Sequence, residues 1–95
     1  MEKYELVVIV DANAPQEKKE SILKETTDTI NKSEGKVINS QVWIDKHRFS
    51  FRIQKCLEGT YYTVNFEAVP TAIAKIRQYL KLNEEILRSL IVRAE

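Results

Sequence analysis

The sequence predicts an α+β fold whose elements follow one another in the order β-α-β-β-α-β. Three observations support this prediction. A short run of β-branched apolar residues opens the chain, and two stretches with apolar residues at helical spacing each follow a proline. Between these two stretches, apolar and polar residues alternate with the period of a strand. Together these observations predict a four-stranded sheet and two helices.

The first strand is predicted at 4–10 (YELVVIV). Because this run is almost continuously apolar, we expect a central strand that is buried on both faces. Pro15 suits the first turn of a helix, and apolar residues three and four positions apart then predict a helix over 16–33. A late lysine and Gly35 are expected to end this helix, with the glycine in the left-handed cap.

The segment 36–67 is predicted to form a hairpin of two strands, each with one buried face, because its apolar residues recur at every second position. On this pattern Phe49 and Phe51 are expected to face the core. A short connection ending in a glycine is expected at 56–59. Residues 44–46 interrupt the alternation and predict a β-bulge or a bend.

A second helix is predicted to begin near Pro70 and to end before Leu82, and the last strand is predicted at 86–92. Strict alternation would place Ile86 and Arg88 on the same face of that strand, which we expect to be a partly exposed edge. The order β-α-β-β-α-β is the split βαβ plan of ferredoxin-like folds, a four-stranded antiparallel sheet with two helices on one face. The other face of the sheet is left uncovered.

Length and composition restrict the class of protein. The 95 residues suit a single domain over 1–95, and the formal charge of +1 by itself predicts no nucleic-acid partner. Cys56 is the only cysteine, so no internal disulfide is possible and a reducing, cytosolic setting fits best. The apolar run at 6–10 is far shorter than the ~20 residues that cross a bilayer.

The sequence offers little for catalysis. His47 is the only histidine, and neither an HExxH motif, a nucleophile elbow nor a P-loop is present. The adjacent carboxylates Glu84 and Glu85 point apart on either a helix or a strand, and we expect them in a solvated turn. We therefore predict no catalytic residues, no metal site and no cofactor. Lys55 beside Cys56 would favour the thiolate mildly, although an incidental loop cysteine is the simpler interpretation.

Basic residues concentrate on the predicted hairpin. The segment 43–55 holds four Lys or Arg residues and His47 against one acid, Asp45, with aromatic residues between them. This composition is typical of surfaces that neutralise phosphates and stack bases. A solvated strand edge, where Lys and Arg prevent pairing with other strands, explains the basic residues equally well.

Several different short motifs follow one another along the chain in a characteristic order and spacing. They are Tyr4-Glu5, Glu34-Gly35-Lys36, Trp43 followed by Lys46 to Lys55, Asn65 to Ala68, Leu82-Asn83-Glu84 and Ile86-Leu87-Arg88. Over essentially the whole chain they resemble ribosomal protein six of the bacterial small subunit. The middle stretch is similar to the family's Trp-Gly-basic-basic-x-Leu-Ala-Tyr-x-Ile-x-Lys pattern. It departs from that pattern at Ile44-Asp45, which replaces the glycine and adds one residue, and at Phe51, which replaces the tyrosine.

This resemblance implies a structural component of the bacterial small ribosomal subunit, cytoplasmic and ribosome-associated. It implies binding to the central domain of small-subunit ribosomal RNA together with ribosomal protein eighteen, and neither a membrane nor DNA as a partner. The side chains expected to contact RNA phosphates by their charge are Lys3, Lys46, His47, Arg48, Lys55 and Arg88.

Other function classes stay open at this stage. One is a partner-independent module that binds single-stranded RNA by aromatic stacking on the uncovered sheet face. Another is a small-molecule-sensing regulatory domain, although such a domain would need glycine-rich turns and this chain has just Gly35 and Gly59. A small enzyme that uses His47 as an acid or base would need a convergent acid and a pocket, which the sequence does not show.

Overall fold

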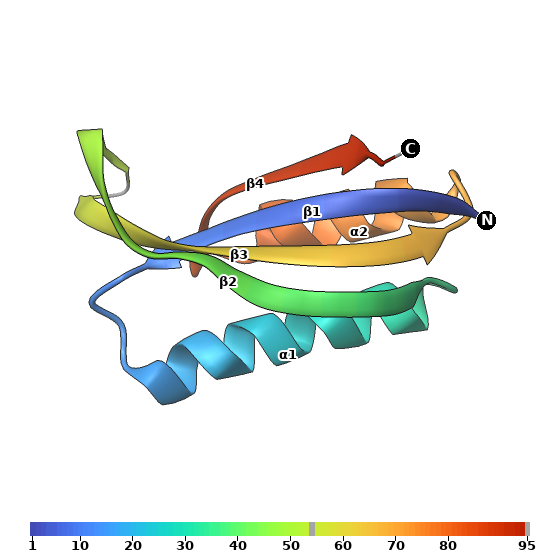
Figure 1. Cartoon of the computed structure of the whole chain (residues 1–95), viewed down its shortest axis with the longest axis horizontal. Helices are drawn as coiled ribbons and strands as arrows, with labels where there is room; N and C mark the ends of the chain where they lie inside the picture. The colour runs from blue at the N-terminus through green and yellow to red at the C-terminus, as the bar shows by residue number, and fades with distance from the viewer. Residues whose placement is uncertain (54, 95) are drawn as a thin grey trace.

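The computed structural model describes residues 1–53 and 55–94, in which four strands form one antiparallel sheet with two helices on one of its faces (Figure 1). The elements are β1 (Glu2–Asp11), α1 (Gln16–Lys32), β2 (Lys36–Ile53), β3 (Cys56–Ala68), α2 (Ala72–Leu82) and β4 (Ile86–Arg93). The strand order across the sheet is β2-β3-β1-β4. The predicted ferredoxin-like fold is therefore confirmed.

Strand β1 lies in the middle of the sheet, as its apolar composition predicted, and pairs with β3 on one side and β4 on the other. Tyr4, Leu6, Val8 and Val10 are buried, whereas the residues between them are half-buried. The expectation that β1 is buried on both faces is wrong. The helices cover one face of the sheet, so alternate residues of β1 lie on the open face.

The core forms where the alternating residues of β1 and β3 meet the apolar stripes of the two helices. Leu6 and Phe66 on the sheet, Ile30 on α1 and Ile76 on α2 are fully buried. The predicted stripe of α2 is thus confirmed. The hydroxyl of Thr26, buried on α1, donates a hydrogen bond of 2.8 Å to the carbonyl oxygen of Ile22, which satisfies it inside the helix.

The end of α1 differs from the prediction. Glu34, with φ of 66°, adopts the left-handed conformation that was expected of Gly35. The N–H of Gly35 donates to the carbonyl oxygen of Ile30 at 2.9 Å. A Cβ on Gly35 would lie 2.8 Å from that oxygen and 3.2 Å from the carbonyl oxygen of Glu67. A glycine is needed here because two backbone segments approach closely, not because φ is positive.

The β2–β3 hairpin turns earlier in the chain than predicted. Residues 56–59, predicted as the connection, are the first residues of β3, and Lys55 lies in the turn with φ of 68°. Position 54 lies outside the described residues. The bulge predicted at 44–46 is confirmed, because Ile44 pairs with Tyr61 whereas His47 pairs with Gly59. The register of β2 shifts at several further places, and each shift leaves at least one extra residue on β2 relative to β3.

A bulge in β4 also corrects the predicted alternation of that strand. Ile86 pairs with Val10 and Arg88 pairs with Ile9, so Leu87 is an extra residue. Ile86 is buried in the core, whereas Arg88 is opposite a residue of the open face. The prediction that Ile86 and Arg88 share a face is wrong because one inserted residue reverses the alternation.

Replacing Gly35 with alanine tests the close approach at the end of α1. We expect Gly35→Ala to lower the free energy of unfolding by about 1–3 kcal/mol, because the backbone atoms that its Cβ would contact cannot move aside independently. Urea denaturation measures this change. Lys24→Ala is the control, since Lys24 is an exposed residue of the same helix. A Gly35→Ala protein as stable as the parent would contradict this account.

Candidate nucleic-acid interface

The end of the β2–β3 hairpin projects past the helices and curls away from the plane of the sheet (Figure 1). Bulges increase the local twist of a strand, and β2 contains several register shifts between Val37 and Ile53. One of them is held by the hydroxyl of Thr60, which donates a 2.7 Å hydrogen bond to the backbone oxygen of Asp45. The sequence thus builds an arm without a helix beneath it. We name it the hairpin arm, and it comprises residues 46–53 of β2 and Lys55 in the turn.

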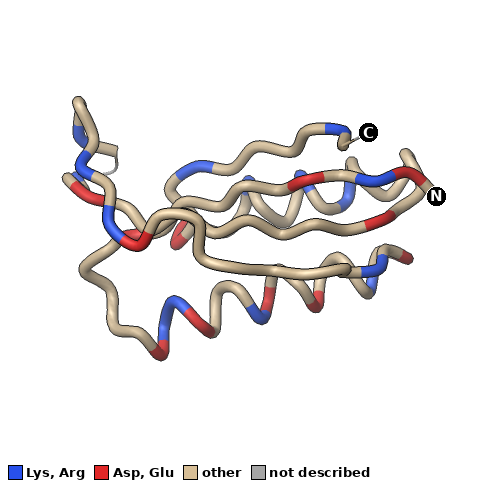
Figure 2. Tube along the Cα trace, viewed as in Figure 1, with Lys and Arg blue, Asp and Glu red and all other residues tan. Residues whose placement is uncertain are grey.

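Basic residues lie along this arm (Figure 2). Lys46, Arg48 and Arg52 are all exposed. Lys46 Nζ lies 3.6 Å from Glu58 Oε1, and the side chain of Lys46 stays more than half exposed in this pair. Exposed ion pairs of this kind contribute little to stability, so the lysine can exchange the carboxylate for another anion at little cost.

Four of the six side chains predicted to contact RNA lie on one hairpin, and a fifth lines a hollow beside it. Lys46, His47, Arg48 and Lys55 all belong to the hairpin arm. Arg88 reaches the same region from β4, because it lines one hollow together with His47. Lys3 lies apart from them at the opposite end of the sheet, where it pairs in register with Glu67. The predicted basic surface therefore divides into the arm with Arg88 and a separate site at Lys3.

Arg52 is a candidate that the sequence prediction passed over. It lines two hollows beside Arg88, one of them with Leu87 and Ser89 of β4. Its place within the basic run of the hairpin was a signal visible in the sequence. Its proximity to β4 was not visible, because the twist of the hairpin creates it.

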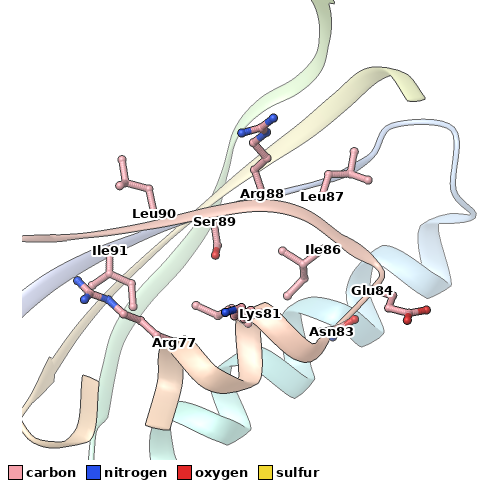
Figure 3. Close-up of a pocket in the computed structure, with 11 residues that line it drawn as sticks. Arg77, Lys81, Asn83, Glu84, Ile86, Leu87, Arg88, Ser89, Leu90 and Ile91 are labelled. Atoms are coloured by element: carbon pink, nitrogen blue, oxygen red, sulfur yellow. The ribbon is translucent and has the colours of Figure 1, made fainter. Parts of the chain in front are cut away.

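Two further cations come from α2. Arg77 and Lys81 line a hollow of about 530 Å³ between α2 and β4, which also contains Glu84. Figure 3 shows Ser89 pointing toward α2 and Arg88 pointing away from it. Arg88 also lines this hollow, but its side chain points away from the two cations of α2. No motif indicated them, because their neighbourhood arises from the packing of α2 beside β4.

Aromatic rings gather on the open face around Tyr61. The rings of Trp43 and His47 meet Tyr61 edge to face, with centroids 5.9 and 5.5 Å away. Phe49 lies 6.5 Å from Tyr61 and directly over Gly59, where a Cβ would collide with its ring. Phe49 was predicted to face the core. That prediction is wrong, since the ring packs on the open face and is half-buried there.

The aromatic rings continue into an uncovered apolar surface, which we name the open-face patch. Its members come from β1, β2, β3 and β4 and line one hollow of about 410 Å³ that also includes Glu5, Arg88 and Ser89. They are Val7, Ile9, Trp43, Tyr61, Leu90 and Val92. Trp43 is 59% exposed and Leu90 is 60% exposed. Apolar side chains grouped and exposed in this way are typical of an interaction surface.

The surroundings of Cys56 disfavour the thiolate, whereas the sequence suggested that Lys55 would favour it mildly. Burial raises the pKa of the Cys56 thiol, and the negative charge of Asp11 and a hydrogen bond to it raise this pKa further. Lys55, its neighbour in the chain, does not offset these effects. The hypothesis of a favoured thiolate is therefore wrong, because pairing of the hairpin with β1 brings a carboxylate to the thiol.

Residues 1–53 and 55–94 contain no group of three or more His, Cys, Asp or Glu side chains that could hold a metal ion. Over the same residues, neither α1 nor α2 is long and apolar enough to cross a membrane.

Comparison with known proteins decides the family. The model of the family described as ribosomal protein S6 matches residues 3–93. The chain belongs to this family. The resemblance drawn from the sequence motifs is thereby confirmed, and the chain is a ribosomal protein rather than an enzyme.

Several relatives of the S6 family match along the whole chain. The small ribosomal subunit protein bS6 of Micrococcus luteus is 36% identical over 95 residues, which cover 100% of this chain and 93% of that protein. The protein of the same name from Cutibacterium acnes is 33% identical, with 100% and 98% covered. The crystal structure of the 30S ribosomal protein S6 of Thermotoga maritima has the same fold, with a TM-score of 0.89 at 22% identity, over 98% of this chain and 87% of that one.

The raised pKa of Cys56 predicts slow alkylation. At pH 8 we expect iodoacetamide to modify the folded chain more slowly than the urea-unfolded chain, because less thiolate is present. Asp11→Asn should accelerate the reaction, since it removes the nearby charge while its side-chain oxygen can still accept the hydrogen bond from the N–H of Asn13. Asp28→Asn on α1 is the control. Mass spectrometry follows the modification, and equal rates for folded and unfolded chains would contradict the prediction.

Proposed function

We propose that this chain is a structural component of the bacterial small ribosomal subunit, which binds the central domain of small-subunit ribosomal RNA together with ribosomal protein eighteen. The chain acts as one domain over 1–95, in the cytoplasm and within the ribosome. The observation that supports this most directly is the position of the basic hairpin arm and Arg88 beside the open-face patch. Membership of the S6 family and the names of its relatives support the ribosomal assignment.

The charged part of the surface suits RNA. Lys46, Arg48, Arg52 and Arg88 present cations from two elements, and lysine and arginine bind phosphate by charge and by hydrogen bonds. Paired RNA offers side chains mainly its shape and its sugar-phosphate backbone. A few phosphate contacts give weak, salt-dependent binding, so the RNA affinity of this surface needs a second contribution.

The apolar part of the surface suits a protein. The open-face patch combines aromatic and aliphatic side chains, the composition of the buried centre of protein interfaces. A protein bound there and also attached to the RNA would make the RNA contacts of the arm effectively intramolecular. Ribosomal protein eighteen is the partner that the family resemblance implies.

The exposed ring of Trp43 beside Tyr61 favours a second candidate, a partner-independent module that stacks single-stranded RNA. In such modules the aromatic rings lie flat for bases to stack on. Here the rings meet edge to face and adjoin Leu90 and Val92, which offer no stacking surface. We therefore prefer the proposal with a protein partner.

Replacing a cation of the arm tests the RNA contacts. With ribosomal protein eighteen present, we expect Arg48→Gln to weaken binding to a central-domain RNA fragment and to reduce the salt slope by about 0.7 to 0.9. Filter binding at several salt concentrations measures both quantities. The matched control is Lys24→Gln, an exposed cation of α1 on the far face. If the parent chain and its partner together bind no RNA, the proposed function is wrong.

Two leucines of similar exposure test the protein contacts. Leu90 lies in the open-face patch at 60% exposed, whereas Leu82 at the end of α2 is 71% exposed. We expect Leu90→Asp to weaken binding of ribosomal protein eighteen at least tenfold, about 1.4 kcal/mol, because a charge would be buried in the interface. Leu82→Asp should have no effect. Titration calorimetry without RNA measures both, and equal affinities would exclude the open-face patch as the binding surface.

A further inference from the structure

We propose that Phe51 at the end of the hairpin arm, with Arg52 and Arg88, forms a stacking site for one unpaired base of the bound RNA. The ligand is a nucleotide that protrudes from the RNA helix, its base on the phenyl ring and its phosphate near the guanidinium groups. This inference rests on the proposed RNA binding and specifies a contact within it. It assigns a role to Phe51, an aromatic residue that lies outside the core.

Phe51 is placed unusually for a phenylalanine. It is 84% exposed, although the alternation of the sequence predicted it to face the core. That prediction is wrong because the arm extends beyond the helices, so no core lies beneath its last residues. Burying such a side chain would be favourable, and this fold leaves its apolar surface in contact with water.

The neighbouring rings do not cover Phe51. His47 and Phe49 on the same strand both contact Tyr61, with ring centroids 5.5 and 6.5 Å away. Among the described residues, none of the ring pairs includes Phe51. The ring therefore lies beside these aromatic side chains without stacking on them, and its own surface is available to a ligand.

The surroundings of Phe51 have the size and the charge for a nucleotide. It lines a hollow of about 240 Å³ together with His47, Phe49, Arg52 and Arg88. Drug-sized ligands occupy about 300–1,000 Å³, so this hollow suits one planar ring system rather than a helix of RNA or protein.

The two arginines distinguish a nucleotide from an apolar protein segment. Arg52 comes from β2 and Arg88 from β4, and no acidic residue is among the described residues that line the hollow. Guanidinium groups bind phosphate and also stack on bases. An apolar protein side chain would gain from Phe51 but would leave both cations without a partner. The combination of ring and cations therefore favours RNA.

Three substitutions of Phe51 test the inference in the complex with ribosomal protein eighteen and a central-domain RNA fragment. Phe51→Ala should weaken RNA binding about five- to 150-fold, because one stacked base is lost. Phe51→Leu keeps an apolar side chain without a ring and should lose almost as much, whereas Phe51→Tyr should bind like the parent. The salt slope should stay unchanged in all three, because Phe51 contacts no phosphate.

A spectroscopic measurement identifies the base. Unpaired purines of the fragment are replaced one at a time by 2-aminopurine, whose fluorescence falls when an aromatic ring stacks on it. We expect one position to be quenched by the parent complex and not by the Phe51→Ala complex. Thermal unfolding is expected to show the same stability for both proteins, because Phe51 is exposed.

The outcomes separate the two proposals. If the parent chain forms no complex with RNA and partner, the proposed function itself fails. If the complex forms and Phe51→Ala binds RNA as tightly as the parent does, the stacking site is wrong. If Phe51→Ala weakens binding of ribosomal protein eighteen without RNA, Phe51 contacts the protein, which also overturns the inference.

Discussion

The packing of β1 and β3 against the two helices is the interaction on which the rest of this structure depends. Leu6 and Phe66 on the sheet meet Ile30 and Ile76 on the helices, and all four are fully buried. Two helices can cover only one face of the sheet. The open-face patch and the unsupported end of the hairpin are therefore direct consequences of how this small core is built.

Register shifts in the edge strands β2 and β4 decide where the cations of the sheet lie. The register shifts of β2 twist the hairpin out of the sheet, and the extra residue Leu87 turns Arg88 onto the open face. Both changes act in the same direction, since they bring cations from strands at opposite edges of the sheet to one end of the molecule. A regular sheet would have kept Arg52 and Arg88 apart.

The resulting surface places two kinds of interaction side by side. The cations of the arm are exposed, and the ion pair of Lys46 with Glu58 is too weak to withhold the lysine from RNA. The open-face patch offers apolar area that is buried only when another molecule covers it. Electrostatic attraction and apolar burial each give modest affinity alone, and a complex that uses both would gain from each.

The sequence by itself determined the order of the elements, the core and the family. Apolar residues that recur at a period of two or about 3.6 indicate which side of each strand or helix is buried. The concentration of Lys and Arg in the hairpin follows directly from the composition of that segment. Only the tertiary structure decided the left-handed Glu34, the earlier turn after Ile53, the face of Arg88 and the exposure of Phe51. Periodicity describes one element at a time. Bulges, twist and the limited cover of two helices depend on neighbouring elements, and they decide where each side chain finally lies.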